Sequence, residues 1–285
     1  MKQKYNDYTL PHYSVLMSVY SKDDPGHLDQ SIRSMVNQTV SPDQFVLVED
    51  GPLTKEQLDV IQSYNHEIPG LFTIVSLPEN KGLGYALGIG LEACCNDIVA
   101  RMDADDISLP DRCEAQLRAF ADDPSLSIVG AHIDEFYDDP QKVICSRIVP
   151  LTHEDIFRAS GRIMPFNHPV VMYRKGDVNR CGGYGTLRRK QDRDLFSRMM
   201  HGGCRAKNID RPLLLFRSDE SSYKRRKSWE YCFSTINVSF TIWKRGHCTL
   251  SDLLYVIVGQ SALFLLPLPL MKKLSDKKLR RRYIT

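Results

Sequence analysis

The feature that most constrains the fold is the alternation of short apolar runs with amphipathic segments over the first hundred residues. We expect strands at 14–19, 44–48, 72–76 and 97–102, separated by helices at 28–36, 55–64 and 83–93. In the first helix, Leu28, Ile32, Met35 and Val36 recur at the spacing of one buried helical face. Strands that are joined by helical crossovers pair in parallel. The sequence therefore predicts an α/β fold with a doubly wound sheet.

The second half of the chain has a less regular pattern. It predicts helices at 111–120, 192–200 and 228–243, and strands at 128–133, 143–149 and 170–173. Internal repeats and low-complexity linkers are absent from the sequence. We therefore expect a single domain whose C-terminal half is mixed.

Composition excludes several classes of protein. With 42% hydrophobic residues the 285-residue chain is too apolar for whole-chain disorder, and its single long uncharged stretch excludes a polytopic membrane protein. A net charge of +3 does not predict a nucleic-acid partner. The eight cysteines lack C-x-x-C spacing, so we expect buried free thiols and no zinc site. Residues 1–11 lack the apolar core of a secretory signal.

Acidic residues follow two of the predicted parallel strands. Asp50 ends the second, and Asp103 and Asp105 directly follow the fourth. Ligands bind beyond the carboxyl ends of strands in such sheets. Alternate residues of an extended segment point the same way, so Asp103 and Asp105 can share one side. Crowded carboxylates favour a hard divalent cation such as Mg²⁺ or Mn²⁺.

An alternative interpretation of this acidic segment stays open. Asp106 or Ser108 could be the N-cap of the next helix, ahead of Pro110. In that case the acids would belong to a capping loop and would not form a metal site.

The glycine-rich segment 80–90 does not have the spacing of a dinucleotide-binding fingerprint. Three residues separate Gly84 from Gly88, whereas the fingerprint has two, and the segment follows the third strand. Its backbone N–H groups could hold a phosphate at the helix start. Close packing of helix against strand explains the small residues equally well.

In combination, several segments resemble the bacterial family 2 glycosyltransferases, which have the nucleotide-diphospho-sugar-binding GT-A fold. The resemblance covers residues 13–217 and rests on segments 14–20, 48–51, 80–82, 101–112, 167–174 and 191–198. Within the family, the chain is most similar to enzymes that build capsular polysaccharide, amylovoran-type exopolysaccharide and O-antigen repeat units. The implied fold is a GT-A doubly wound sheet with a mixed C-terminal half and a C-terminal helical segment that associates with membranes.

The resemblance implies a role for particular residues. Asp192 would be the catalytic base, Asp105 and Asp103 would bind Mn²⁺ or Mg²⁺, and His168 and Gln191 would lie on the acceptor side. The implied contacts to the nucleotide sugar are Val19, Tyr20, Asp50, Asn80, Gly82, Arg101 and Asp103.

The sequence departs from the family pattern at two positions. In addition, two of the implied site residues have an ordinary structural alternative. Gln191 stands where the family usually has Glu, and Gly88 where it often has Asn. Asp192 could also be the N-cap of the following helix. His168 could be a satisfied core or loop histidine.

The activity that the resemblance implies is an inverting, metal-dependent hexosyl transfer. The donor would be a UDP-sugar carrying galactose or glucose, and the acceptor a saccharide on polyprenyl diphosphate in O-antigen, capsule or exopolysaccharide assembly. A non-catalytic nucleotide-sugar-binding membrane subunit is one alternative. A sugar nucleotidyltransferase is another, although it should have a glycine-rich basic loop after the first strand, where this chain has the acidic segment 20–24. The oligomeric state is not predicted.

The predicted domains are a glycosyltransferase domain over 1–217 and a helical extension over 218–285. The first would comprise a nucleotide-binding half, 13–106, and an acceptor half, 107–217. In the extension, residues 253–271 carry no charge, but Pro267 and Pro269 would limit the helix to about 21 Å, short of a ~30 Å hydrocarbon core.

The basic tail 272–285 contains seven basic residues and one acid. We therefore expect the apolar segment and the tail to lie on an anionic membrane surface. The resemblance implies that this surface is the cytoplasmic face of a bacterial inner membrane. A true membrane span, or a core or dimer helix, are the alternatives for residues 253–271. The basic run 224–227 either adds to this surface or is simply solvated.

Overall fold

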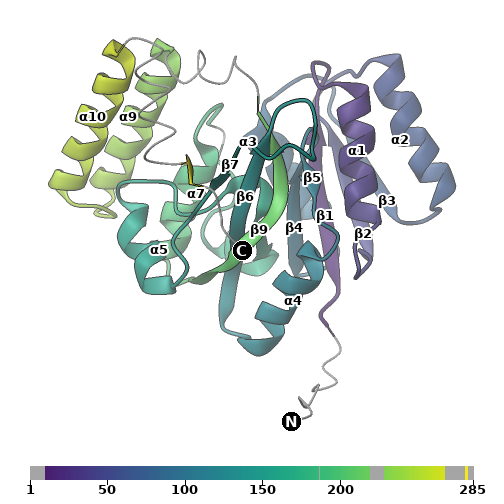
Figure 1. Ribbon diagram of the computed structural model, residues 1–285, viewed down its shortest axis with the longest axis horizontal. Helices are drawn as coiled ribbons and strands as arrows, with labels where there is room; N and C mark the ends of the chain where they lie inside the picture. Colours follow the sequence, from purple (N-terminus) through teal and green to yellow (C-terminus); the bar gives the residue numbers. More distant parts are fainter. Residues whose placement is uncertain (1–9, 186, 219–227, 267–279, 282–285) are drawn as a thin grey trace.

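The computed structural model describes residues 10–185, 187–218, 228–266 and 280–281. A single mixed sheet runs through the molecule, with helices on both of its faces and a helical hairpin at one side (Figure 1). The order along the sheet is β10-β7-β6-β8-β4-β1-β2-β3, with β9 pairing with β5 and β6.

The N-terminal half has the predicted parallel arrangement. Strand β1 lies between β2 and β4, β3 pairs with β2, and all these pairs are parallel. The elements are β1 (Tyr13–Val19), α1 (Pro25–Val36), β2 (Gln44–Glu49), α2 (Lys55–Glu67), β3 (Phe72–Ser76), α3 (Leu83–Ala93) and β4 (Ile98–Asp103).

The C-terminal half makes the sheet mixed, because β8 pairs antiparallel with both β4 and β6. Its elements are β5 (Ile107–Ser108), α4 (Arg112–Asp122), β6 (Leu126–Phe136), β7 (Cys145–Arg147), α5 (His153–Ser160), the 3-10 helix η1 (His168–Val170), β8 (Met172–Arg174), α6 (Lys175–Arg180), α7 (Gln191–His201) and β9 (Arg205–Arg217). The long strand β9 was not expected from the sequence. It runs parallel to β6 and brings Arg217 to the carboxyl edge of β4.

Alternating side chains of the central strands face two separate hydrophobic clusters. From β1, Val15 and Met17 pack in the cluster with α1, α2 and α4. Leu16 packs in the cluster with α3 and α7. Burial on both faces explains why these strands are continuous apolar runs.

Helices α1 and α2 each begin at a residue whose side chain caps the helix. The Asp24 carboxylate accepts from the backbone N–H of His27 (3.0 Å) at the start of α1, and Pro25 occupies the first helical turn. Helix α2 has a capping box formed by Thr54 and Gln57. These caps place the loops after β1 and β2 at the carboxyl edge of the sheet.

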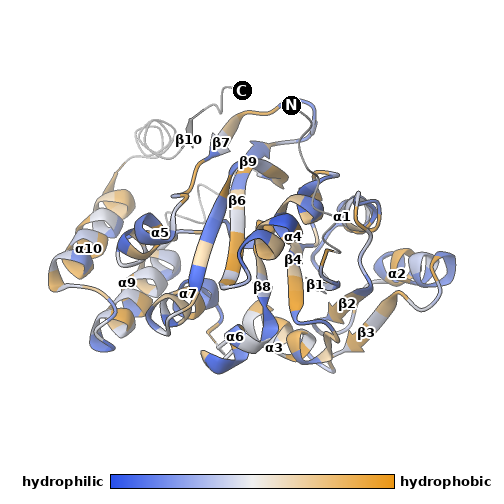
Figure 2. Ribbon diagram, turned by 90° about the horizontal axis from the view of Figure 1, so that it is seen from below, coloured by the Kyte–Doolittle hydropathy of each residue, from blue (hydrophilic) through white to orange (hydrophobic). Residues whose placement is uncertain are grey.

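Helices α9 (Trp229–Lys244) and α10 (Leu250–Leu265) form a hairpin beside α7 (Figure 1). The first matches the predicted helix 228–243. The second begins before the predicted segment and ends ahead of Pro267, and most of the predicted remainder lies outside the described residues. Figure 2 shows hydrophobic residues along α10 as well as within the sheet. Among the described residues, none of the helices combines the length and the apolarity needed to cross a membrane.

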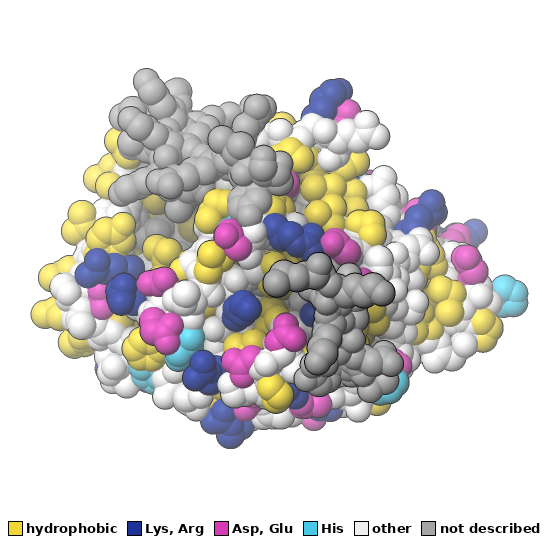
Figure 3. All heavy atoms as spheres, turned by 60° about the horizontal axis from the view of Figure 1, so that its bottom comes forward, with side chains coloured by type: hydrophobic (Ala, Val, Ile, Leu, Met, Phe, Trp, Pro, Cys, Tyr) yellow, Lys and Arg dark blue, Asp and Glu magenta, His cyan; other side chains and the backbone are white. Residues whose placement is uncertain are grey.

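The last described segment, β10 (Arg280–Arg281), pairs antiparallel with β7. The rest of the basic tail and the basic run 224–227 lie outside the described residues. On the face seen in Figure 3, acidic and basic side chains are interspersed.

Candidate active site

The loops that follow β1, β2 and β4 meet at one edge of the sheet. Val19 in β1 is in register with Glu49 in β2, and Ser18 with Asp103 in β4. Neighbouring strands lie about 4.8 Å apart, so Asp50 and Asp103 flank the end of β1 at roughly 10 Å. The structure thus brings together residues that the sequence placed in the nucleotide-sugar site, including Tyr20, which is 39% exposed.

Three carboxylates are crowded at the end of β4. One oxygen each from Asp103, Asp105 and Asp106 lies within 4.8 Å of the others. Asp103 and Asp105 are partly exposed, whereas Asp106 is fully buried. Burial, and then the charge of Asp103, raises the pKa of Asp105 to about 6. Burial and the neighbouring acids raise the pKa of Asp106 well above its usual range.

This oxygen-only cluster fits a hard divalent cation. Within the described part of the chain, Asp106 Oδ2 is buried and has no hydrogen-bond partner. Mg²⁺ and Mn²⁺ prefer carboxylate ligands, and a divalent charge would relieve the repulsion among the three acids.

The helix-cap interpretation of Asp106 and Ser108 is wrong. The residue that precedes α4 is Asp111, and its side chain makes no capping hydrogen bond. Asp106 Oδ1 accepts from the backbone N–H of Arg217 (2.9 Å), and the Ser108 hydroxyl accepts from Gln38 Nε2 (3.1 Å). Asp106 therefore ties β9 to the acidic cluster.

Arg217 is a site residue that the sequence prediction missed. Its Nε donates to the backbone oxygen of Asp105 (2.9 Å), and its Nη2 to Gln30 Oε1 (2.7 Å). The guanidinium thus lies at the rim of the carboxylate cluster, where it can contact an anionic ligand. The apolar run 213–216, which Arg217 follows, was the signal in the sequence that could have predicted this strand.

Arg101 supports the cluster from inside the sheet. It is 1% exposed, and its Nη2 donates to Asp103 Oδ1. Burial opposes its charge, but the adjacent Asp103 outweighs that effect and raises the pKa of Arg101. In the described structure, Nε and Nη1 of Arg101 have no hydrogen-bond partner. Arg101 is therefore a buried cation next to the carboxylates that fit a metal, and two of its nitrogens remain available to donate hydrogen bonds.

Asp50 organises the loop before α3. It is 3% exposed, its Oδ1 accepts from the backbone N–H of Lys81 (2.8 Å), and its Oδ2 from that of Gly82 (3.0 Å). Gly82 has a φ of 90°, which favours glycine. Asn80 Nδ2 donates to the backbone oxygen of Asp50 (3.2 Å). Each carboxylate oxygen can still accept one further hydrogen bond, so the predicted contact with the base stays a prediction.

Asp192 lies in the first turn of α7. The residue before the helix is Lys190, in the left-handed conformation with a φ of 65°, so Asp192 is not the N-cap. Its Oδ1 accepts from the backbone N–H of Arg193 (2.9 Å). Burial raises the pKa of Asp192, while Lys190 and then Arg101 act to lower it. A partly exposed carboxylate with a raised pKa is suited to accept a proton.

His168 is held within a buried polar chain. Its Nε2 lies 2.9 Å from the Tyr184 hydroxyl, which donates to the Tyr173 hydroxyl (3.3 Å). Burial, and then Arg101, lowers the pKa of His168 well below its usual value, so the ring is neutral. This arrangement favours the interpretation of His168 as a satisfied core histidine. The sequence prediction did not single out Tyr184, whose flanking glycines were the only local signal.

The start of α3 packs against the start of α7. A Cβ added to Gly84 would lie 2.5 Å from the backbone oxygen of Gly185 and 3.2 Å from Gln191 Cβ. Gln191 is buried in this contact. Arg101 acts electrostatically on both Asp103 and Asp192. Asp103 and Asp192 therefore both lie within the electrostatic reach of Arg101, and their predicted roles stay predictions.

Comparison with known proteins agrees with this arrangement. The Pyrobaculum calidifontis mannosyltransferase PcManGT, solved in complex with GDP-Man and Mn²⁺, superimposes with a TM-score of 0.65 at 16% identity, over 94% of this chain and 74% of that one. Staphylococcus aureus TarS 1-349 in complex with UDP gives a TM-score of 0.57 at 14% identity, over 93% of this chain and 72% of that one. These similarities show the GT-A fold.

Two curated relatives are more similar in sequence. The Escherichia coli UDP-Gal:alpha-D-GlcNAc-diphosphoundecaprenol beta-1,3-galactosyltransferase is 31% identical over 95% of this chain and 98% of its own length. The Erwinia amylovora amylovoran biosynthesis glycosyltransferase AmsE is 36% identical, over 79% and 84% respectively. Residues 14–196 match the family described as Glycosyl transferase family 2. The chain is therefore a glycosyltransferase that belongs to family 2.

Proposed function

We propose that this glycosyltransferase moves a hexose, galactose or glucose, from a UDP-sugar to a saccharide carried on polyprenyl diphosphate, with inversion and with a divalent metal. The observation that carries the proposal is the cluster of Asp103, Asp105 and Asp106 at the end of β4. Arg101 hydrogen-bonds Asp103 and also acts on the charge of Asp192. The name of the Escherichia coli relative, which gives both a UDP-Gal donor and a diphosphoundecaprenol acceptor, supports the substrate classes.

The donor would bind along the carboxyl edge of β1, β2 and β4. Asp103 and Asp105 would hold Mn²⁺ or Mg²⁺, which supplies Lewis-acid stabilisation of the leaving diphosphate. Arg217, already bonded to the backbone oxygen of Asp105, adds positive charge at the rim. Asp50 would hydrogen-bond the base and keeps the Asn80–Gly82 loop in place.

On the acceptor side, Asp192 would remove the proton of the attacking hydroxyl. The acceptor oxygen forms a bond to the anomeric carbon as the bond from that carbon to the diphosphate breaks on the opposite face, so the configuration inverts. General-base assistance of this kind contributes roughly 10²–10⁴-fold. The raised pKa of Asp192 suits this step, and Tyr184 lies near enough to be influenced by its charge.

The C-terminal part of the chain would hold the enzyme at the cytoplasmic face of a bacterial inner membrane. We assign residues 1–217 to the transfer domain and 218–285 to a helical extension. In α10, Leu254, Val258 and Leu265 are more than half exposed, so this helix offers large apolar side chains to a membrane surface. Together with the basic tail, they would attach the protein peripherally.

The test is release of UDP from UDP-galactose and UDP-glucose in the presence of a synthetic GlcNAc-diphosphate-lipid, with and without a chelator. We expect metal-dependent UDP release that needs the acceptor. Binding of the UDP-sugar without turnover on any acceptor would instead identify a binding subunit. Release of inorganic pyrophosphate from a nucleoside triphosphate would identify a nucleotidyltransferase.

A further inference from the structure

The segment 187–190 connects the nucleotide side of the site to the helical hairpin. Arg188 Cγ lies 4.0 Å from the point where a Cβ on Gly82 would stand. Two residues later, Lys190 Nζ lies 3.7 Å from the ring centroid of Tyr231 in the first turn of α9. We call Arg188, Arg189 and Lys190 the basic strip.

The charges of the basic strip are available to a ligand. Arg188 and Arg189 are exposed, and Lys190 is partly exposed. Within residues 10–185, 187–218 and 228–266, none of the three forms an ion pair within 4.0 Å, although other surface arginines such as Arg158 do. Hydrogen bonds at Glu230, and then the charge of Arg189, lower the pKa of Glu230, which places Arg189 near the start of α9. Among the described residues, the strip is thus a cationic edge beside Asp192, with carboxylates near it but none in a close ion pair with it.

An apolar pocket of about 210 Å³ adjoins the far end of this strip. We call it the hairpin pocket; it is lined by Trp229, Cys232, Ile236, Ser261, Phe264 and Leu265. The Trp229 and Phe264 rings meet edge to face, with centroids 5.9 Å apart. Trp229 is 63% exposed and Leu265 is 77% exposed. Cys232, which lines the pocket, follows Tyr231 in α9. Burial raises the pKa of Cys232 and the charge of Lys190 acts to lower it, so this cation lies near the pocket.

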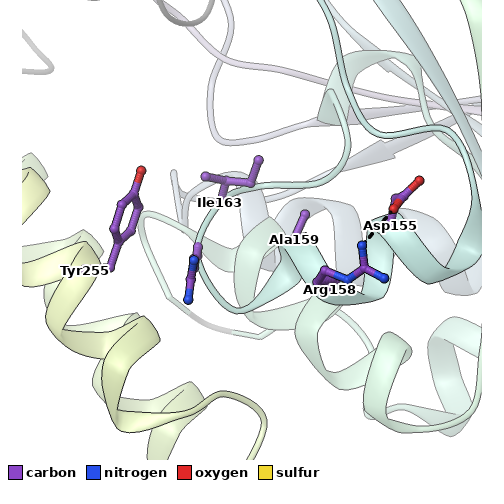
Figure 4. A pocket seen from close by; sticks show the side chains of 6 residues that line it. Asp155, Arg158, Ala159, Ile163 and Tyr255 are labelled. Atoms are coloured by element: carbon purple, nitrogen blue, oxygen red, sulfur yellow. Dashed lines mark hydrogen bonds and ion pairs between the residues drawn. The ribbon is translucent and has the colours of Figure 1, made fainter.

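A second pocket of about 280 Å³, between α5 and α10, lacks these properties (Figure 4). Its charged groups are already paired, because Arg158 lies 3.3 Å from Asp155 and Arg162 lies 2.5 Å from Asp252. The Arg162 guanidinium also lies over the Tyr255 ring, 5.6 Å from its centroid. The charged groups of this pocket are therefore already paired, unlike the three cations of the basic strip.

We propose that the basic strip and the hairpin pocket bind the polyprenyl diphosphate part of the acceptor. The diphosphate binds Arg188, Arg189 and Lys190, and the first isoprene units occupy the hairpin pocket. This inference rests on the lipid-linked acceptor of the proposed function. The order of groups along the surface matches such an acceptor, because Asp192, the cations and the apolar pocket follow one another as saccharide, diphosphate and tail do.

The short separation between Lys190 and Asp192 is also compatible with an acceptor whose diphosphate is close to its saccharide. One residue separates Lys190 from Asp192, so their Cα atoms lie within about 7 Å of each other, and Lys190 is close enough to act on the pKa of Asp192. Guanidinium and ammonium groups are the usual partners of phosphate oxygens. A bilayer surface alone would not need free cations beside the catalytic carboxylate.

The experiment compares two soluble acceptors without vesicles or detergent: GlcNAc diphosphate esterified with farnesyl, and the same compound with a methyl ester. We expect the farnesyl acceptor to have the lower KM by about tenfold or more, since burying a few methylenes suffices. Trp229→Ser should remove that advantage and leave the methyl acceptor unchanged. The double change Arg188→Gln and Arg189→Gln should raise KM for both acceptors by about tenfold.

The controls lie at the far end of α9. Phe240 is 44% exposed and lies against Lys244, so Phe240→Ser and Lys244→Gln remove an exposed aromatic ring and a cation from the same helix. Both variants should keep the wild-type KM values. Equal KM for the two acceptors in the wild type, or equal effects of Trp229→Ser and Phe240→Ser, would overturn the proposed tail site.

A binding measurement separates this inference from the proposed function. The chain has two tryptophans, so Trp243→Phe leaves Trp229 as the only one. Farnesyl diphosphate should quench its fluorescence saturably, farnesol more weakly, and inorganic diphosphate not at all. Saturable quenching without turnover on any acceptor would refute the proposed function and retain the lipid-diphosphate site. Turnover without such quenching would refute the site alone.

Discussion

The buried guanidinium of Arg101 hydrogen-bonds the carboxylate of Asp103, two residues further along strand β4. Residues two apart on a strand face the same side, so the bond follows from the strand itself. It fixes an acidic side chain of the site to the central strand of the sheet. In the described structure two further nitrogens of Arg101 have no hydrogen-bond partner, and its charge also acts to lower the pKa of Asp192.

Replacing Arg101 with Met should lower both stability and donor binding. The change removes a charged hydrogen bond from the buried guanidinium to the partly exposed Asp103, which costs roughly 1.5–3 kcal/mol. We expect a decrease of this order in the free energy of unfolding by urea denaturation, and weaker UDP-sugar binding by calorimetry. Arg101→Lys keeps the charge and should recover part of the stability; unaltered donor affinity in Arg101→Met would remove Arg101 from the site.

Asp192→Asn should reduce kcat by roughly 10²–10⁴-fold and leave the UDP-sugar Kd nearly unchanged, because only proton removal is lost. Asp194 is the matched control on the same helix. It is paired with Arg198 (2.9 Å) and Arg245 (2.5 Å), so Asp194→Asn should lower Tm while kcat per folded molecule is retained. Strong residual transfer by Asp192→Asn would exclude Asp192 as the base.

The pH profile of kcat should have an acid limb above the ordinary range of an Asp side chain. A general base works only when deprotonated, and burial raises the pKa of Asp192, so the rate should fall as pH decreases through that raised value. Lys190→Gln removes the cation that most lowers this pKa and should move the limb to higher pH. A limb that does not move in Lys190→Gln would contradict this environment for Asp192.

Asp105→Asn should weaken Mn²⁺ binding in the presence of the UDP-sugar, because one carboxylate of the cluster is lost. Calorimetric titration of metal into the donor complex measures the effect. Asp111→Asn is the control, since Asp111 pairs with Arg211 (2.7 Å) and lies outside the cluster. An unchanged titration for Asp105→Asn would assign the metal to other residues.

Neutralising Lys272, Lys273, Lys277 and Lys278 as glutamines should release the protein from anionic vesicles. Each basic residue near such a surface contributes roughly 1 kcal/mol, and the effect should weaken with salt. Substitution is preferable to deletion, because β10 pairs with β7. Co-sedimentation with anionic and zwitterionic vesicles measures the change; undiminished binding would place the attachment on α10.

The parallel half of the fold could be predicted because its signals are local. Strand and helix periods alternate without interruption from β1 to β4, and the acids after β2 and β4 follow from that order. Asp103 and Asp105 do lie close together, but strand alternation is not the reason, because β4 ends at Asp103 and Asp105 lies in the turn that follows. That Arg101 acts on both Asp103 and Asp192 depends on how α7 packs against the sheet. No local sequence pattern predicts that packing.

The rest of the site depends on long-range pairing. Strand β9 contains Pro212 and several charges, and its register with β6 shifts at more than one point, so its sequence lacks regular alternation. Arg217 therefore reaches Asp106 through contacts between segments 111 positions apart. Tyr184 similarly enters the site from a glycine-rich loop with no periodicity.

The contact of Gly84 with Gly185 has a consequence for how such an enzyme diversifies. Main chain meets main chain there, and not even a methyl group fits between them. The start of α3 is consequently held at a fixed separation from the loop before α7, and under the proposed function a new sugar preference would have to arise from side chains around the site.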